Sequence, residues 1–329
     1  MTLRMKVEAG MCGDPAKFRR RLLGWYDMHR RDLPWRTNGD PYRVWLSEIM
    51  LQQTRVAAVI AHYHEFLRRF PTVERLAVAR EASVLAAWSG LGYYRRARML
   101  YAAAKVVVRV HGGKFPASEK QLRELPGVGR YTAAAIASIA FDEPVAVVDG
   151  NVKRVLRRVT GKRLAGEELW VTANHLLDAK RPGDFNQAMM ELGAVVCTPR
   201  APACLTCPVL ELCATQGELA ATTKPAPQKQ REIHYSLHCR DREIFLVQRS
   251  SDASLMPGMW ELPELPGMKR TASPSFTLRH SITVTDYKVH VWHAAAPSRC
   301  GGKWIPVGRL KQVALTGLAR KILRKAAIL

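Results

Sequence analysis

Four of the seven cysteines lie within seventeen residues, and their spacing is the most specific chemical signal in the chain. Six, two and five residues separate Cys197, Cys204, Cys207 and Cys213, and prolines stiffen the loop between them. Four thiolates in one such loop can surround a single inorganic centre. Zinc ribbons instead pair two C-x2-C units across a longer gap. We therefore expect a four-iron, four-sulfur (4Fe-4S) cluster in residues 197–213, with structural zinc or unliganded thiols as alternatives.

Two carboxylates could divide the work of acid catalysis. Glu48 lies in a helix that Asp40 is expected to cap and Pro41 to begin. It falls outside the apolar stripe of that helix, which comprises Tyr42, Trp45, Leu46, Ile49 and Met50. Glu48 therefore faces either a groove or solvent. Asp149 precedes a second helix, where capping is its simplest role. Carboxylates in two different environments can protonate a leaving group and stabilise a cation at a glycosidic bond.

A turn with two glycines separates a helix that begins after Ser118 from an apolar helix at 132–141. Its sequence is Leu125-Pro126-Gly127-Val128-Gly129-Arg130. Gly127 and Gly129 allow the backbone to turn sharply and to present N–H groups at the start of the second helix, where a phosphate can bind. We predict a helix-hairpin-helix phosphate clamp, although an ordinary helix turn can have the same local pattern.

The charge of the chain indicates a polyanionic partner. Among its 329 residues, 51 Lys and Arg against 28 Asp and Glu leave a net charge of +23. Residues 232–329 contain 15 basic and 7 acidic residues, so the excess is spread over both parts of the chain. There is no signal-peptide pattern and no apolar stretch long enough to span a membrane. We therefore expect a cytoplasmic protein.

The elements that position these residues form two regions. Apolar residues recur at helical spacing over 15–215, which predicts an all-α domain at 1–221. Residues 222–231 contain two prolines and no apolar periodicity, and are expected to form a linker. Residues 232–329 contain β-prone runs at 233–238, 244–248 and 283–292, and a basic amphipathic helix is expected over 307–329. The second domain is therefore expected to be α+β.

Several segments together resemble the adenine DNA glycosylases of the MutY type, a family of the endonuclease III superfamily. Besides the cysteine spacing, they are residues 45–54 (WLSEIMLQQT), 90–94 (GLGYY), 148–154 (VDGNVKR) and 185–193 (FNQAMMELG). The likeness covers nearly all of residues 15–215. It implies an all-α helix-hairpin-helix glycosylase domain with an iron-sulfur cluster loop, followed by an α+β nudix-like C-terminal domain. It also implies base excision repair by hydrolysis of adenine from DNA.

The resemblance assigns catalytic roles. In that family the glutamate matching Glu48 protonates the adenine, and the aspartate matching Asp149 stabilises the sugar cation. Tyr131 and Asn151 match residues that line the same pocket. Relatives that also cut the strand have a lysine at the position of Tyr131, whose amine forms a Schiff base with the sugar. Tyrosine cannot do so, and the resemblance therefore implies a monofunctional enzyme that leaves an abasic site.

The same resemblance assigns contacts to DNA, from which the target base must be flipped out. Residues matching those that enclose the flipped adenine are Trp35, Arg36 and Gln187. Gln53 and Tyr93 match residues that are inserted near the partner base, with Gln52 and Leu91 beside them. Gly127 and Gly129 match the phosphate clamp.

Residues 232–329 resemble the nudix-like domain that senses 8-oxoguanine opposite the adenine. None of the four Arg-Glu pairs in the chain continues as the Arg-Glu-x-x-Glu-Glu run that holds metal in nudix hydrolases, so we expect this domain to bind and not to hydrolyse. The family commonly has Phe-Ser-His in the probing loop, where this chain has Ile282-Thr283-Val284. Thr283 keeps a hydroxyl group, but the aromatic and imidazole groups are missing, which leaves the preference for 8-oxoguanine over guanine open.

We expect a monomer that binds double-stranded DNA with adenine opposite 8-oxoguanine or guanine, on the nucleoid if the protein is bacterial. One alternative is a thymine or uracil mismatch glycosylase of the same superfamily, against which Gln52, Gln53 and Gln187 argue. A bifunctional endonuclease III is another, which Tyr131 disfavours. A catalytically silent lesion-binding protein is the third, and the presence of both carboxylates argues against it.

Overall fold

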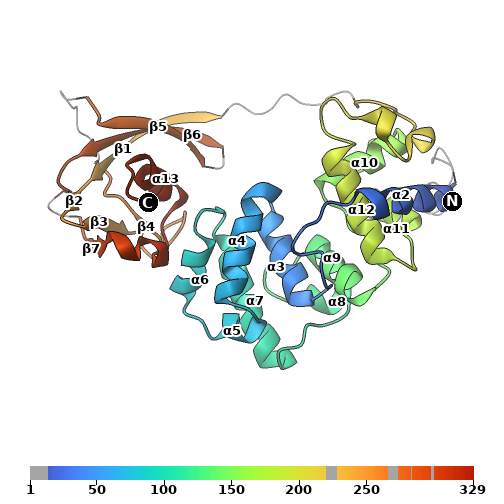
Figure 1. Cartoon of the computed structure of the whole chain (residues 1–329), viewed down its shortest axis with the longest axis horizontal. Coiled ribbons are helices and arrows are strands. Elements are labelled where there is room, and N and C mark those ends of the chain that lie inside the picture. Colours follow the sequence, from blue (N-terminus) through green and yellow to red (C-terminus); the bar gives the residue numbers. More distant parts are fainter. Residues whose placement is uncertain (1–13, 220–227, 266–272, 283, 298–299) are drawn as a thin grey trace. The chain divides into compact units, whose positions relative to one another are not determined.

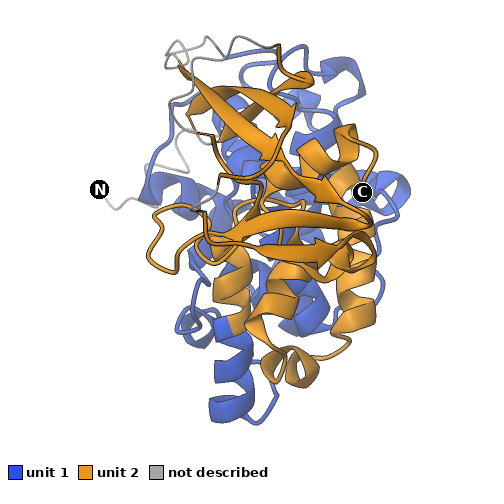
Figure 2. Ribbon diagram, turned by 90° about the vertical axis from the view of Figure 1, so that its left-hand side faces the viewer, with its two compact units in different colours: residues 1–56, 102–222 blue, residues 57–101, 223–329 orange. Residues whose placement is uncertain are grey.

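The structure is a computed structural model that describes residues 14–219, 228–265, 273–282, 284–297 and 300–329. The chain forms two compact units (Figure 2). The first contains residues 1–56 and 102–222, and the second contains residues 57–101 and 223–329. Segment 57–101 therefore packs with the C-terminal part of the chain, although it lies between two segments of the first unit in the sequence.

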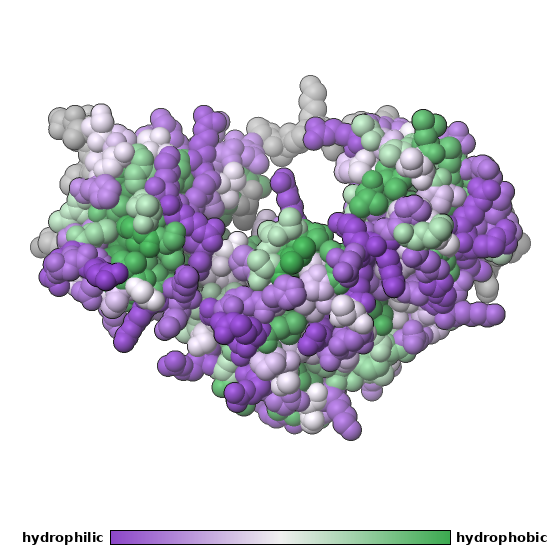
Figure 3. Space-filling model, viewed as in Figure 1, coloured by the Kyte–Doolittle hydropathy of each residue, from purple (hydrophilic) through white to green (hydrophobic). Residues whose placement is uncertain are grey.

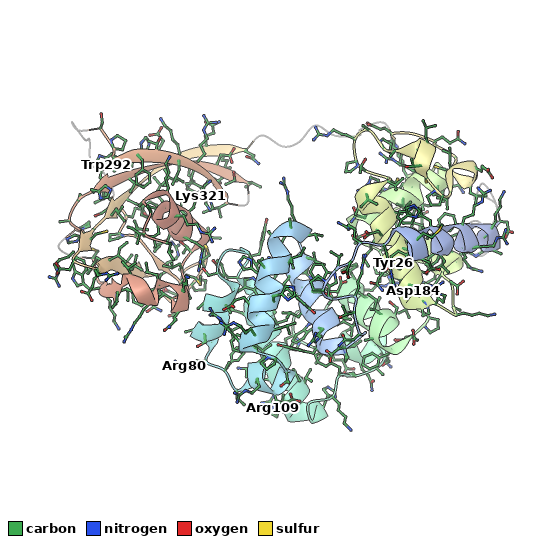
Figure 4. The ribbon with its side chains drawn as sticks, viewed as in Figure 1. Tyr26, Arg80, Arg109, Asp184, Trp292 and Lys321 are labelled. Atoms are coloured by element: carbon green, nitrogen blue, oxygen red, sulfur yellow. The ribbon has the colours of Figure 1, made fainter. Side chains whose placement is uncertain are left out.

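The described part of the first unit is helical (Figure 1). Its helices are α2 (Pro15–His29), α3 (Pro41–Leu51), α8 (Glu119–Leu122), α9 (Arg130–Phe141), α10 (Gly150–Thr160), α11 (Glu167–Leu176) and α12 (Pro182–Val195). Apolar side chains from α2, α9, α10, α11 and α12 share one core. Tyr26 on α2 and Asp184 on α12 lie next to each other at the contact of these helices (Figure 4).

The expected helix starts are confirmed, because each has a polar side chain that accepts a backbone N–H at the helix N-terminus. The carboxylate of Asp40 accepts from Arg43 N at 2.9 Å at the start of α3. That of Asp149 accepts from Val152 N at 2.7 Å at the start of α10. Ser118 caps the short helix α8.

Helix α12 ends the regular helical structure at Val195, twenty residues before the predicted end of the helical pattern. The loop expected at 197–213 follows, in which Pro199, Pro202 and Pro208 lack the N–H that a helix needs. Only two short 3-10 turns form in this loop, at Cys204–Thr206 and Leu210–Leu212.

The second unit contains helices α4 (Val56–Arg69), α5 (Val73–Ala77), α6 (Glu81–Trp88) and α7 (Arg95–His111), the last of which continues into the first unit. Its strands are β1 (Lys229–Leu237), β2 (Cys239–Arg240), β3 (Glu243–Gln248), β4 (Trp260–Glu261), β5 (Phe276–Ile282), β6 (Thr285–His293) and β7 (Lys303–Pro306). One sheet has the order β1-β6-β5, with β1 parallel and β5 antiparallel to β6. In the other, β3 pairs with β2, β4 and β7. Side chains of both sheets and of helix α13 (Gly317–Lys325) form a second core.

The α+β character of this region is confirmed, with differences in detail. Strand β1 begins at Lys229, inside the stretch expected to be a linker, and β5 and β7 were not predicted. The helix expected over 307–329 is wrong in its bounds: a 3-10 helix at Val307–Gln312 comes first, and α13 starts only after Thr316, which caps it. Leu315 lies in a β-bridge with Trp260, which interrupts the helical pattern.

The surface agrees with a chain rich in charged residues, since most of the face seen in Figure 3 is hydrophilic. No helix in the part of the chain that the structure describes is long and apolar enough to cross a membrane.

Candidate active site

A cleft of about 1000 Å³ opens in the first unit. Its walls come from α3, from the start of α9, from the start of α10, from α12, and from the segment that joins α2 to α3. Both candidate carboxylates, Glu48 and Asp149, line it. Residues far apart in the sequence thus meet in one concave site of the size typical for a small ligand.

Glu48 lines this cleft, and a groove was one of the two environments, groove or solvent, that the helix pattern allowed for it. Its exposed fraction is 7%, because α3 is buried on most of its circumference and not only on the predicted stripe. The hydroxyl of Tyr131, on the first turn of α9, donates a hydrogen bond to Glu48 Oε2 at 2.6 Å. The sulfur of Met190 lies 3.2 Å from the same hydroxyl.

The surroundings of Glu48 raise its pKa. The pKa of Glu48 is raised to about 7: burial is the largest cause and the charge of Asp149 also raises it, whereas the hydrogen bond from Tyr131 and the charge of Arg36 lower it. Burial also raises the pKa of Tyr131 well above its usual value, so its hydroxyl keeps its proton and donates. A buried carboxyl group that is part protonated at pH 7 is suited to general acid catalysis.

Asp149 combines a capping role with a place in the cleft. One carboxylate oxygen caps α10, and the other accepts a hydrogen bond from Asn151 Nδ2 at 3.1 Å. Burial raises the pKa of Asp149, and the hydrogen bonds from Val152 and Asn151 partly offset this shift. The N-terminus of α10 also favours the ionised carboxylate.

The segment before Asp149 is fixed by two asparagines that sequence reasoning missed. The side chain of Asn186, on α12, accepts from Val147 N at 3.0 Å and donates to Val145 O at 2.8 Å. Asn174 Oδ1 accepts from Ala146 N at 3.0 Å. Asn186 is 1% exposed, and a polar residue in an otherwise apolar stretch of helix was the available signal, since buried polar groups need partners.

A buried ion pair forms another wall of the cleft. Glu191 is 1% exposed and accepts hydrogen bonds from Arg31 at 2.6 and 2.9 Å and from Arg36 at 2.8 Å. Burial raises the pKa of Glu191, but the two arginines outweigh this effect and lower it overall. Trp35, which is expected to enclose the base, is buried and lines the cleft. Arg36 also lines it, with one guanidinium nitrogen on Glu191.

The glycine turn has the geometry of a backbone anion site. Gly127 has a φ of +74°, which favours glycine, and Gly129 is the N-cap of α9. Both are exposed, whereas Leu125 and Val128 are buried and anchor the turn. The first N–H groups of α9 therefore have no side-chain cap at Gly129.

Helix α3 ends in a second tight turn at the rim of the cleft. Gln52 Nε2 donates to Thr132 Oγ1 at 3.3 Å, which ties this turn to α9. Gln53 is exposed with a φ of +56°, an unfavourable conformation for a residue other than glycine. Such strain is concentrated at functional sites.

The four clustered cysteines line one small cavity together with apolar side chains of α10 and α12. Arg158 on α10 holds the loop by donating to Thr198 O at 2.7 Å and to Pro199 O at 3.0 Å. The pKa of the Cys207 thiol is raised to about 11, chiefly by burial and also by the neighbouring thiols. Among the described residues, no group of three or more His, Cys, Asp or Glu side chains could hold a metal ion.

Comparisons with known proteins identify the family. The profile of the HhH-GPD superfamily of base excision DNA repair proteins matches residues 46–167. The adenine DNA glycosylase of Mus musculus is 50% identical over 81% of this chain and 63% of its own length. That of Schizosaccharomyces pombe is 40% identical over 76% of this chain and 69% of its own length. The chain belongs to the adenine DNA glycosylase family.

A solved structure of a related enzyme confirms the helical glycosylase fold. A thermostable thymine-DNA glycosylase is 32% identical, with a TM-score of 0.58, over 61% of this chain and 96% of its own. The mammalian adenine DNA glycosylases are longer than the present chain, which spans less than two thirds of their length.

Within this adenine DNA glycosylase fold, the cleft brings together most of the predicted site residues: Trp35, Arg36, Glu48, Gln52, Gln53, Gly127, Gly129, Tyr131, Asp149, Asn151 and Gln187. Leu91 and Tyr93 belong to the second unit, where Leu91 is 6% exposed and Tyr93 is 49% exposed. Thr283 lies outside the described residues.

Proposed function

We propose that the protein hydrolyses the N-glycosidic bond of adenine in double-stranded DNA. The observation that carries this proposal is the buried Glu48, hydrogen-bonded by Tyr131 and sharing a cleft with Asp149. Family membership supports the same activity. The net charge of +23 supports a DNA partner.

The proposed reaction begins with the adenine flipped into the cleft. Glu48 donates its proton to a ring nitrogen of the adenine, which makes the base a better leaving group. The bond between the base and the sugar breaks with its electron pair leaving on adenine, and positive charge develops on the sugar. The carboxylate of Asp149 stabilises this cation until water adds to it. The proton that the water loses restores the protonated Glu48, and an abasic site remains.

The residues around the carboxylates set the outcome of this step. Tyr131 holds Glu48 in place and has no amine to attack the sugar, so hydrolysis is the expected end of the reaction. We assign Gln187 to the edge of the adenine, because its amide has both a donor and an acceptor and has no hydrogen-bond partner among the described residues.

We propose that the cysteine loop holds a 4Fe-4S cluster. In such a cluster each thiolate binds its own iron, and the four thiols that line one cavity fit this arrangement. The cluster would supply structural cross-linking of the loop. Visible absorbance with matching iron and sulfide contents in the purified protein would support it, and zinc in their place would contradict it.

We further propose that residues 232–329 act as a nudix-like domain that reads 8-oxoguanine opposite the adenine. This is the part in which the chain departs from the common Phe-Ser-His loop, at 282–284. We propose a glycosylase domain at 1–221 and this lesion-reading domain, joined by a linker that is shorter than the expected 222–231 because β1 begins at Lys229.

The decisive measurement is single-turnover base excision on four matched duplexes, with A opposite 8-oxoguanine, A opposite G, T opposite G and U opposite G. Fast adenine release is expected, and Glu48→Gln should lower it by about 10²- to 10⁴-fold. Equal rates for the wild type and Glu48→Gln would contradict the mechanism. Covalent trapping with borohydride should fail in the wild type.

The thymine or uracil mismatch glycosylase remains the second candidate, because the solved thymine-DNA glycosylase shares the fold. Release of thymine or uracil without adenine would favour it. Adenine release without a preference for 8-oxoguanine would instead retain the proposed reaction and place the loss in the loop at 282–284.

A further inference from the structure

The turn between α6 and α7 has an unusual backbone. Gly90 and Gly92 have φ values of +112° and +73°, and Tyr93 follows with a φ of +49°. A residue with a side chain disfavours this left-handed conformation by roughly 1–2 kcal/mol. It persists only where the surrounding structure holds it. Tyr93 is itself 49% exposed, so the constraint must come from its neighbours.

Part of that constraint is local. Trp88 Nε1 donates to Gly92 O at 3.2 Å, and Arg96 Nη2 donates to the same oxygen at 3.2 Å. The guanidinium of Arg96 also lies 5.6 Å from the centre of the Tyr93 ring. These contacts fix the carbonyl before Tyr93 and one face of its ring.

The other part comes from the C-terminal region of the same compact unit. Tyr94 and Ser89, each 4% exposed, flank the turn and donate to one backbone oxygen, Leu315 O, at 2.9 and 2.8 Å. Arg320 on α13 donates from Nε to Ser89 Oγ at 3.1 Å. Both lone pairs of the Leu315 carbonyl are therefore used to hold the two ends of the turn.

Leu315 is fixed in turn by the strands. It forms a β-bridge with Trp260. Trp260 makes backbone hydrogen bonds with the residues on either side of Leu315: Trp260 N donates to Ala314 O at 2.8 Å, and Thr316 N donates to Trp260 O at 2.9 Å. A displacement of the β4 strand or of the start of α13 would therefore move the acceptor of the Tyr94 and Ser89 hydroxyls.

We propose that Tyr94, Ser89 and Arg320 are positioning residues through which the segment at 314–320 fixes the exposed Tyr93 for insertion into DNA. The inference rests on the proposed function, in which Tyr93 fills the space beside the partner base. Tyr93, the residues that hold it and the proposed lesion-reading domain then all belong to the second compact unit.

The test uses the full-length protein and single-turnover adenine excision. Tyr94→Phe and Arg320→Met each remove one donor at nearly constant volume, and the rate should fall by about 2- to 10-fold, as for the loss of one hydrogen bond. Tyr101→Phe is the matched control, since Tyr101 lies on α7, the helix that begins directly after Tyr94, and donates to Ala79 O at 2.7 Å, away from the turn. It should leave the rate unchanged.

A double-mutant cycle separates positioning from general support of the fold. In a Tyr93→Ala background, Tyr94→Phe should cause no further loss, because the side chain that it positions is gone. Fluorescence of 2-aminopurine beside the adenine reports unstacking directly and should fall in Tyr94→Phe. Additive losses, or a Tyr94→Phe enzyme equal to the wild type, would overturn the inference.

Failure of the proposed function gives a different result. In that case the wild type would release adenine from none of the duplexes. The change in 2-aminopurine fluorescence on binding would still show whether Tyr93 enters the DNA duplex and whether Tyr94→Phe prevents this.

Discussion

For Glu48, the sequence predicted a position off the apolar stripe and a role as an acid, but not its raised pKa. Helical periodicity placed it off the apolar stripe, and it faces the cleft. Its raised pKa could not be predicted, because it depends on burial by segments far along the chain and on Tyr131, 83 residues away. Periodicity reports neighbours along one helix, whereas the pKa depends on everything packed around the group.

The pKa of Glu48 predicts the pH dependence of base release. A general acid acts in its protonated form, so the rate should be highest below pH 7 and should fall as the pH rises through about 7, the pKa of Glu48. Tyr131→Phe removes a hydrogen bond that lowers this pKa, and should move the fall to higher pH. Single-turnover rates measured from pH 5.5 to pH 9 provide the test, and a rate that increases with pH would contradict it.

At the scale of elements, the cleft depends on the close approach of α10 and α12. Gly193 lies where a Cβ atom would come within 2.6 Å of Asn151 Cβ and 3.1 Å of the Asn151 backbone. Such distances are too short for any side chain, so the two helices would have to separate. Asn151 donates to Asp149, and the contact therefore reaches the site.

Gly193→Ala should consequently destabilise the fold by about 1–3 kcal/mol, as overpacked sites do, and should also slow excision. Gly24→Ala is the matched control, since no atom lies within 4 Å of its Cβ position on α2, and alanine there should be neutral or stabilising by up to about 1 kcal/mol. Chemical denaturation of both variants gives the comparison. Equal stability of the two variants would mean that the helices adjust without cost.

The elements that were predicted correctly have local causes. Asp40 and Asp149 each cap a helix by accepting from a backbone N–H three positions later in the chain. The break before α13 has a distant cause, the pairing of Leu315 with Trp260. Strands β5 and β7 likewise form through pairing with β6 and β3, and short apolar runs alone do not specify such partners.

At the scale of the whole molecule, the excess of positive charge should dominate DNA affinity. Each phosphate that Lys or Arg neutralises releases counterions, so the logarithm of the binding constant should fall linearly with the logarithm of salt concentration, with a slope of about −0.9 per contact. Titrations of a duplex at several salt concentrations measure this slope. A binding constant independent of salt would rule out an electrostatic role for the charge of +23.

The interleaved order of the two units has a consequence for biosynthesis. Residues 57–101 leave the ribosome early, but Ser89 finds its acceptor on Leu315, 226 residues later. The turn that carries Tyr93 therefore cannot exchange water for these hydrogen bonds until residue 315 has been made. A nascent chain of intermediate length contains all of the first unit, which ends at residue 222, but only part of the second, so the first unit is expected to fold before the second.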